Sequence, residues 1–338
     1  MIEGYRIAPI PLRFAEEQEQ LIAFLARHQL RYESDIQSAF GIYDEQDDLV
    51  GCGCAAGCLM KCFAVEPALR GQNALGLLVS YLAQERFAAG YYDLFVITRL
   101  HNEMLFSQCA LFPVVRTSQL VLLENQQDGP EKFVANFLEA GDEEKVVGSI
   151  VMNCNPFTLG HLALVEYAAK HCDVLHLFVV EEDRSEFPTQ IRLRLVQEGT
   201  QHLSNVRVHL SGQYIISAAT FPTYFLKEGE DAAALQTELD IMLFAQRIAP
   251  SLYIQKRFAG EEPFDPTTAR YNQAMKKILP CYGIAFCEIP RVKQGGGAIS
   301  ASRVRRLLKE RGVCDEVLSL VPPTTASYLQ REYQSRSV

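Results

Sequence analysis

The chain contains no tryptophan and no apolar segment of the ~18 residues that a membrane-spanning helix needs. Its first residues, MIEGYRIAPIPLRFAEEQEQ, lack the basic segment and apolar run of a secretory signal. With 21 glycines and 15 prolines in 338 residues, it is neither collagen-like nor of low complexity. These absences predict a cytoplasmic protein without membrane segments. Its 48% hydrophobic and 22% charged residues are typical of globular proteins, and the length allows two domains.

A metal-ligand pattern is also missing. Four of the ten cysteines, Cys52, Cys54, Cys58 and Cys62, are closely spaced, but C-x-C-x3-C-x3-C lacks the paired C-x2-C units of common zinc sites. We interpret them as reduced, small buried residues on adjoining strands. The histidines after residue 170 show no ligand spacing either. The sequence therefore predicts no metal site.

Positive charge is scarce in the first part of the chain. Residues 1–145 hold 11 Lys and Arg against 21 Asp and Glu, whereas residues 146–338 hold 21 against 20. Such a balance argues against nucleic-acid binding. Residues 291–311 are an exception, with seven basic side chains and one acid. This basic segment favours a small anionic ligand, such as a nucleotide.

Short apolar strands alternate with helices in the second half. Strands are predicted at 146–153, 174–180, 206–210, 252–255 and 284–288, and helices at 159–171, 189–202, 231–248, 267–279 and from 300 onward. This alternation predicts an α/β fold with a doubly wound, Rossmann-like parallel sheet, which binds ligands at the carboxyl ends of its strands. The earlier residues predict a separate α+β domain. We expect domains at 1–130 and 141–338.

Two segments place small polar residues at helix starts. Asn153–His161, with the pattern T-x-G-H, follows the first strand of the second domain, and Gly160 permits close approach of a ligand. The segment from Ile299 to Arg305 opens the last long helix with two serines and two arginines. Helix N-termini bind phosphate, although a capped helix with a packed histidine or a solvated basic face also fits each segment taken alone.

Together these segments resemble the two signatures of the nucleotidyltransferase superfamily, H/T-x-G-H and I-S-S-T-x-x-R. The resemblance implies that ATP is a substrate, with Mg²⁺ accompanying its phosphates, and that His161 and Arg305 are catalytic. The implied nucleotide-binding residues are Asn155, Phe157, Thr158, Gly160, His161, Ser300, Ser302 and Arg305. Ala301 and Ser302 stand where the second signature has serine and threonine, whereas Arg305 matches directly.

A narrower resemblance covers essentially the whole chain. The segments SGQYIISAATFPTYFLK (211–227) and GEEPFDPTTARYN (260–272) resemble the citrate lyase ligase family. That resemblance implies activation of acetate as acetyl-adenylate and acetylation of the citrate lyase acyl carrier. The acceptor is the thiol of a phosphoribosyl-dephospho-coenzyme A arm, and AMP and pyrophosphate are released. No nucleic acid or membrane partner is implied.

The first domain resembles GNAT acetyltransferases at one turn. Arg70-Gly71-Gln72-Asn73 resembles the start of their R/Q-x-x-G-x-G/A turn, which binds the pyrophosphate of coenzyme A, although Asn73 replaces the glycine. Arg70, Gly71 and Asn73 are therefore predicted to bind the acceptor arm. Two other functions fit parts of the sequence: a coenzyme-biosynthetic adenylyltransferase of the pantetheine-phosphate type, and a non-catalytic module that binds coenzyme A or an acyl carrier.

Overall fold

The computed structural model describes residues 2–181, 185–215, 221–263, 265–291, 293–294 and 297–333. The chain forms two compact units: a first unit, Met1–Gly129 with Thr220–Met242, and a second unit, Pro130–Ala219 with Leu243–Val338. None of the helices in the described ranges is long and apolar enough to cross a membrane.

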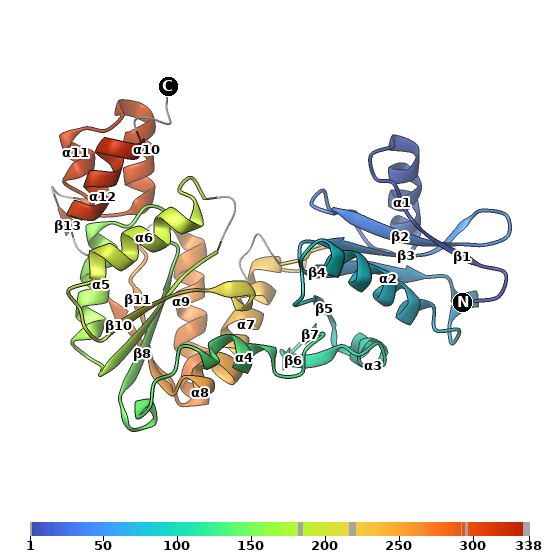
Figure 1. Ribbon diagram of the computed structural model, residues 1–338, viewed down its shortest axis with the longest axis horizontal. Helices are drawn as coiled ribbons and strands as arrows, with labels where there is room; N and C mark the ends of the chain where they lie inside the picture. The colour runs from blue at the N-terminus through green and yellow to red at the C-terminus, as the bar shows by residue number, and fades with distance from the viewer. Residues whose placement is uncertain are drawn as a thin grey trace. The chain divides into compact units, whose positions relative to one another are not determined.

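The first unit is built on a mixed seven-stranded sheet with the order β1-β2-β3-β4-β5-β7-β6. Its strands are β1 (Arg6–Pro9), β2 (Ser38–Tyr43), β3 (Leu49–Ala56), β4 (Leu59–Val65), β5 (Phe95–Arg99), β6 (Phe112–Arg116) and β7 (Leu120–Glu124). The helices are α1 (Ala15–Arg27), α2 (Ala74–Ala88) and α3 (Glu103–Ser107) (Figure 1). This unit is the predicted α+β domain. Its neighbouring strands run antiparallel except β4 and β5, which pair in parallel only at Leu59 and Phe95.

Both faces of this sheet are covered because side chains alternate along each strand. Cys52 and Cys54 of β3 lie in a core with α1, whereas Ala55 lies in a core with α2. Cys62 of β4 joins the α1 side, so three of the four closely spaced cysteines are buried core residues, as interpreted from the sequence.

The second unit is a five-stranded parallel sheet with the order β10-β9-β8-β11-β12. Its strands are β8 (Val147–Met152), β9 (Val174–Val179), β10 (Val206–Leu210), β11 (Ile254–Gly260) and β12 (Ala285–Ile289), with a short hairpin of β13 (Lys293–Gln294) and β14 (Gly297–Ala298). The helices are α4 (Gly129–Ala135), α5 (Leu159–Ala169), α6 (Thr189–Thr200), α8 (Ala249–Ser251), α9 (Pro266–Ile278), α10 (Ala301–Arg311), α11 (Asp315–Leu318) and α12 (Pro323–Tyr328). This is the doubly wound fold that the alternation predicts.

The central strands of this sheet are buried on both faces. Every residue of β9 and all of β8 except Val151 are buried. Helix α5 packs against β8, β9 and β11, and α6 packs against β9 and β10. The last helices complete the same core through Val304, Leu308 and Val317.

The segment before and within α7 (Ala232–Leu243) belongs to the first unit, whereas the sequence assigned it to the second domain. Tyr224 is buried in the α1 side of the first unit's core. Thr223 donates from its backbone N–H and its hydroxyl to the Glu33 carboxylate, at 2.7 and 2.8 Å. The guanidinium of Arg31 donates to the Thr223 carbonyl at 2.8 Å. We call residues 221–242 the inserted segment.

Candidate functional site

Helix α5 begins directly after β8 and is capped by Thr158. The Thr158 hydroxyl accepts from the His161 backbone N–H, and the Thr158 backbone N–H donates to His161 Nδ1 at 3.1 Å. Because Nδ1 accepts this bond, the neutral imidazole carries its proton on Nε2. The cap therefore fixes the tautomer of His161 and leaves it an N–H donor in the first turn of the helix.

His161 is held in this neutral form by its surroundings. Burial, together with the positive charges of Arg291 and Arg305, lowers the pKa of His161 to about 4. Its ring stacks on that of Phe157, with the ring centroids 6.0 Å apart. At neutral pH, His161 is consequently an uncharged hydrogen-bond donor beside two guanidinium groups.

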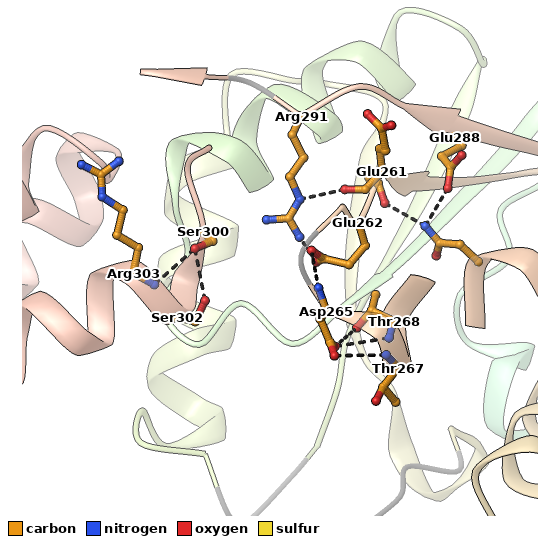
Figure 2. A network of polar contacts seen from close by, with 12 residues as sticks. Glu261, Glu262, Asp265, Thr267, Thr268, Glu288, Arg291, Ser300, Ser302 and Arg303 are labelled. Carbon is orange, nitrogen blue, oxygen red and sulfur yellow. Dashed lines mark hydrogen bonds and ion pairs between the residues drawn. The ribbon is translucent and has the colours of Figure 1, made fainter. Parts of the chain in front are cut away.

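Helix α10 begins at a second capped end. The Ser300 hydroxyl accepts from the Arg303 backbone N–H at 3.2 Å and lies 3.1 Å from the Ser302 hydroxyl (Figure 2). The Arg303 side chain pairs with Glu316 at 3.0 Å. This leaves Ser302 exposed in the first turn, next to the free N–H groups that begin any helix.

These two helix starts meet. A side chain at Gly160 would place its Cβ only 3.1 Å from the Ile299 carbonyl oxygen, so glycine is what allows this approach. Arg305 donates to the Asn155 carbonyl in the loop after β8. The structure thus brings both sequence motifs to one place, at the carboxyl end of the central strand.

The buried side chain of Arg192, in α6, holds the loop after β8 in place. Its side chain is fully buried and donates to the carbonyl oxygens of Phe187, Asn153 and Val180 at 2.9, 2.7 and 2.7 Å. It also reaches the Thr189 hydroxyl at 2.8 Å. A single guanidinium therefore fixes the strand ends from which the site loop begins.

A further arginine, which the sequence counted in the basic segment but assigned no role, lies close to this site. Arg291 follows β12 and donates through Nε to the Glu261 carbonyl at 2.7 Å and through Nη2 to the Glu262 carboxylate (Figure 2). Its charge is close enough to lower the pKa of His161. The cluster of basic residues was the available signal, but nothing local singled out Arg291.

Two residues of the loop after β8 are buried. Phe157 is predicted from the motif to bind nucleotide, but its side chain is fully buried and packs against Gly199 and His161, so its ring is not exposed to the site. Cys154 is buried, and burial raises the pKa of its thiol well above the ordinary value. It is a protonated core residue rather than a nucleophile.

Lys256 and Arg257 of β11 lie away from the site. They pair with Gly148 and Ser149, near the amino end of β8. Lys256 donates to the His171 carbonyl at the far end of α5, and Arg257 stacks on Phe244. Both lie toward the amino end of β8, whereas the site lies at its carboxyl end.

The predicted acceptor-arm residues lie in the turn before α2. Gly71 has φ +80°, and a side chain there would meet open space, so the backbone conformation is what requires glycine. Asn73 also adopts a left-handed conformation and forms the N-cap of α2, with its amide oxygen over Gly76. Arg70 is exposed. The side chain of Asn73 therefore occupies space that glycine would leave open.

The candidate site is built from hydrogen-bond donors and guanidinium groups. No group of three or more His, Cys, Asp or Glu able to hold a metal ion occurs in the described part of the chain. Two helix N-termini, a neutral histidine donor and the Arg305 guanidinium instead meet at the carboxyl end of β8, and Arg291 follows β12 of the same sheet. That arrangement can bind a polyphosphate and stabilise negative charge that develops in a reaction.

Known proteins match this chain over nearly its whole length. Residues 147–329 match the family model described as the citrate lyase ligase C-terminal domain. The citrate (pro-3S)-lyase ligase of Klebsiella pneumoniae is 40% identical over 329 residues, which covers 96% of each chain. The ligase of the same name from Escherichia coli K12 is 36% identical over 93% of this chain and 91% of its own. That of Haemophilus influenzae is 36% identical over 94% and 98%.

Solved structures resemble separate parts of the chain. A GNAT-family acetyltransferase from Staphylococcus aureus is 10% identical and covers 36% of this chain and 99% of its own, with a TM-score of 0.32. Thermotoga maritima TmcAL, solved with alpha-thio ATP, is 17% identical and covers 56% of each chain, with a TM-score of 0.36.

Proposed function

The chain belongs to the citrate lyase ligase family, and we propose that it activates acetate with ATP and acetylates the citrate lyase acyl carrier. The observation that carries the proposal is the meeting of two capped helix starts around His161 and Arg305, at the carboxyl end of β8.

The proposed reaction has two steps. An acetate oxygen attacks the α-phosphorus of ATP, the bond to pyrophosphate breaks, and acetyl-adenylate forms. The carrier thiol then attacks the acetyl carbon, AMP leaves with the electrons of the carbon–oxygen bond, and the thiol proton passes to water. The first step needs positioning and neutralisation of charge more than covalent help from the enzyme.

The residues of the site suit the first step. Neutral His161 is proposed to donate its Nε2–H to a phosphate oxygen as charge develops, and Arg305 is proposed to bind the departing pyrophosphate. Ser300, Ser302 and the backbone around Gly160 are proposed to hold the remaining phosphate oxygens. Asn155 is proposed to shape the site, since its carbonyl orients Arg305 and its side-chain oxygen accepts from the Phe187 N–H.

Mg²⁺ would enter with ATP as part of the substrate. The described residues of the site provide no acidic cluster for a resident ion, so the phosphate oxygens are its proposed ligands. The ten cysteines are free thiols, which suits a protein acting in the cytoplasm.

Acetate-dependent exchange of labelled pyrophosphate into ATP is the test of this function. We expect exchange with acetate and none without it. Exchange that needs a phosphopantetheine instead of acetate would support the adenylyltransferase alternative. No exchange with either compound would support the non-catalytic module and contradict our proposal.

The acceptor arm is proposed to bind at the turn that contains Arg70, Gly71 and Asn73 in the first unit. Arg70 is exposed there and can pair with a phosphate of the arm. Arg70→Gln should raise the KM for the carrier and leave acetate-dependent exchange unchanged. The first unit's exposed Arg13, changed to glutamine, is the matched control, and an unchanged carrier KM in Arg70→Gln would contradict the assignment.

A further inference from the structure

Arg291 is fixed in place in a way that an ordinary surface arginine is not. Two of the five N–H donors of its guanidinium bond to the Glu261 carbonyl and the Glu262 carboxylate. The side chain of Glu262 is only 9% exposed. Its other oxygen accepts from the Asp265 backbone N–H at 3.2 Å. Glu262 is therefore anchored at the start of α9 and holds Arg291 from a defined position.

The segment that carries Glu262 is itself braced. The Glu261 backbone N–H donates to the Ile289 carbonyl at the end of β12, at 2.8 Å. The Asn272 amide donates to the Gly260 carbonyl at 3.0 Å and to Glu288 at 2.9 Å. These hydrogen bonds connect the ends of β11 and β12, the strands that precede Glu262 and Arg291.

We propose that Arg291 contacts a reactant oxyanion in the site of His161, and that Glu262 is the positioning residue that aims it. This inference rests on the proposed function for the identity of the reactants. Arg291 follows β12 and His161 follows β8, so both stand at the carboxyl ends of strands in one parallel sheet, and Arg305 of α10 bonds to the loop after β8. Acceptors of the protein orient both guanidinium groups. Fixed cations beside a neutral donor match an anion with several charged oxygens, and such preformed geometry lowers the entropy lost on binding.

The oxyanion is either a phosphate of ATP or the carboxylate of acetate, and two measurements on Arg291→Gln distinguish them. Loss of a hydrogen bond to a charged group should weaken one interaction by ~10–150-fold. A weaker ATP affinity in the absence of acetate identifies phosphate. An increased KM for acetate with unchanged ATP affinity identifies the carboxylate. The proposal is overturned if the ATP affinity and the KM for acetate both stay within about twofold of wild type, which is well below the loss expected for a charged hydrogen bond.

Glu262 is tested by a double-mutant cycle. Glu262→Gln keeps an acceptor for the Asp265 N–H but removes the charge that holds Arg291. We expect it to weaken the same interaction as Arg291→Gln, and to add nothing when both changes are combined. Additive effects would show that Glu262 does not act through Arg291. Arg270→Gln, at an exposed position of α9, is the matched control and should alter neither measurement.

The titration of His161, followed by NMR, separates this inference from the proposed function. Removing the charge of Arg291 should raise the pKa of His161 from about 4 toward its ordinary value. If wild-type protein binds ATP but shows no acetate-dependent exchange, the proposed function fails while ATP affinity and this titration still decide the role of Arg291. An unchanged His161 titration in Arg291→Gln would contradict the placement of both residues in one site.

Discussion

Replacing Arg192 by methionine should destabilise the second unit and loosen the site loop together. The arginine is the shared donor for the carbonyl oxygens of Phe187, Asn153 and Val180. Methionine has a similar length and fills much of the same volume, so the change removes the donors and the charge without opening a large cavity.

The expected magnitude follows from the acceptors that lose their partner. A buried polar atom left unpaired costs about 1–3 kcal/mol. The bond to Phe187 is buried, whereas those to Asn153 and Val180 lie in partly buried surroundings that water can reach. We therefore expect a loss near the low end of the summed range, about 3–5 kcal/mol in the free energy of unfolding.

Urea unfolding followed by circular dichroism measures this loss, and hydrogen exchange by mass spectrometry locates it. Residues 153–155 and 185–188 should exchange faster in Arg192→Met, while β2 and β3 of the first unit keep wild-type rates. Arg194→Met, two residues along α6, is the matched control and should cost no more than about 1 kcal/mol. An Arg192→Met protein with wild-type unfolding free energy and unchanged exchange at these loops would refute the reasoning.

Three further predictions concern the site and the core of the second unit. His161→Ala should lower acetate-dependent exchange by ~10²–10³-fold with little change in thermal stability, and near-normal exchange would exclude His161 as a catalytic donor. Gly160→Ala should weaken ATP binding because its Cβ presses on the Ile299 carbonyl, and ATP affinity equal to wild type would contradict that contact. Burial and nearby positive charge lower the pKa of His176 to about 4 and of His209 to about 3, below the 6.5 of an exposed imidazole. The unfolded chain takes up these protons at a higher pH than the folded protein does. The free energy of unfolding should therefore be highest above about pH 6.5 and fall as the pH drops toward about 4. A urea midpoint that stays constant between these pH values would contradict this prediction.

The sequence predicted what depends on local pattern. The strand predicted at 146–153 is β8, and the helix predicted from 159 is α5, because apolar periodicity and capping residues act within a few positions. The same holds for the start of α10 at Ser300. Both helix starts of the site could therefore be found from the sequence alone.

What the sequence did not reveal depends on distant partners. The basic segment 291–311 seemed to carry six net positive charges, yet Glu262 pairs with Arg291 from outside it, and Glu316 pairs with both Arg303 and Arg311. The role of Arg291 depends on a residue 29 positions away, and no periodicity within a helix or strand encodes such a pair. Likewise, the burial of Phe157 depends on Gly199 of α6, which allows the aromatic ring to approach.

The inserted segment limits how the two units can be assigned separate roles. Residues 221–242 lie between β10 and β11 in the sequence, yet Tyr224 is buried with Cys54 and Cys62 in the first unit's core. Removing residues 1–140 would leave Tyr224 without that core, and losing the burial of a large aromatic side chain costs about 3–5 kcal/mol. A truncated protein that lost activity would then report exposure of this segment as much as loss of an acceptor site. Point substitutions such as Arg70→Gln avoid that ambiguity, because they change the exposed turn while the core around Tyr224 stays intact.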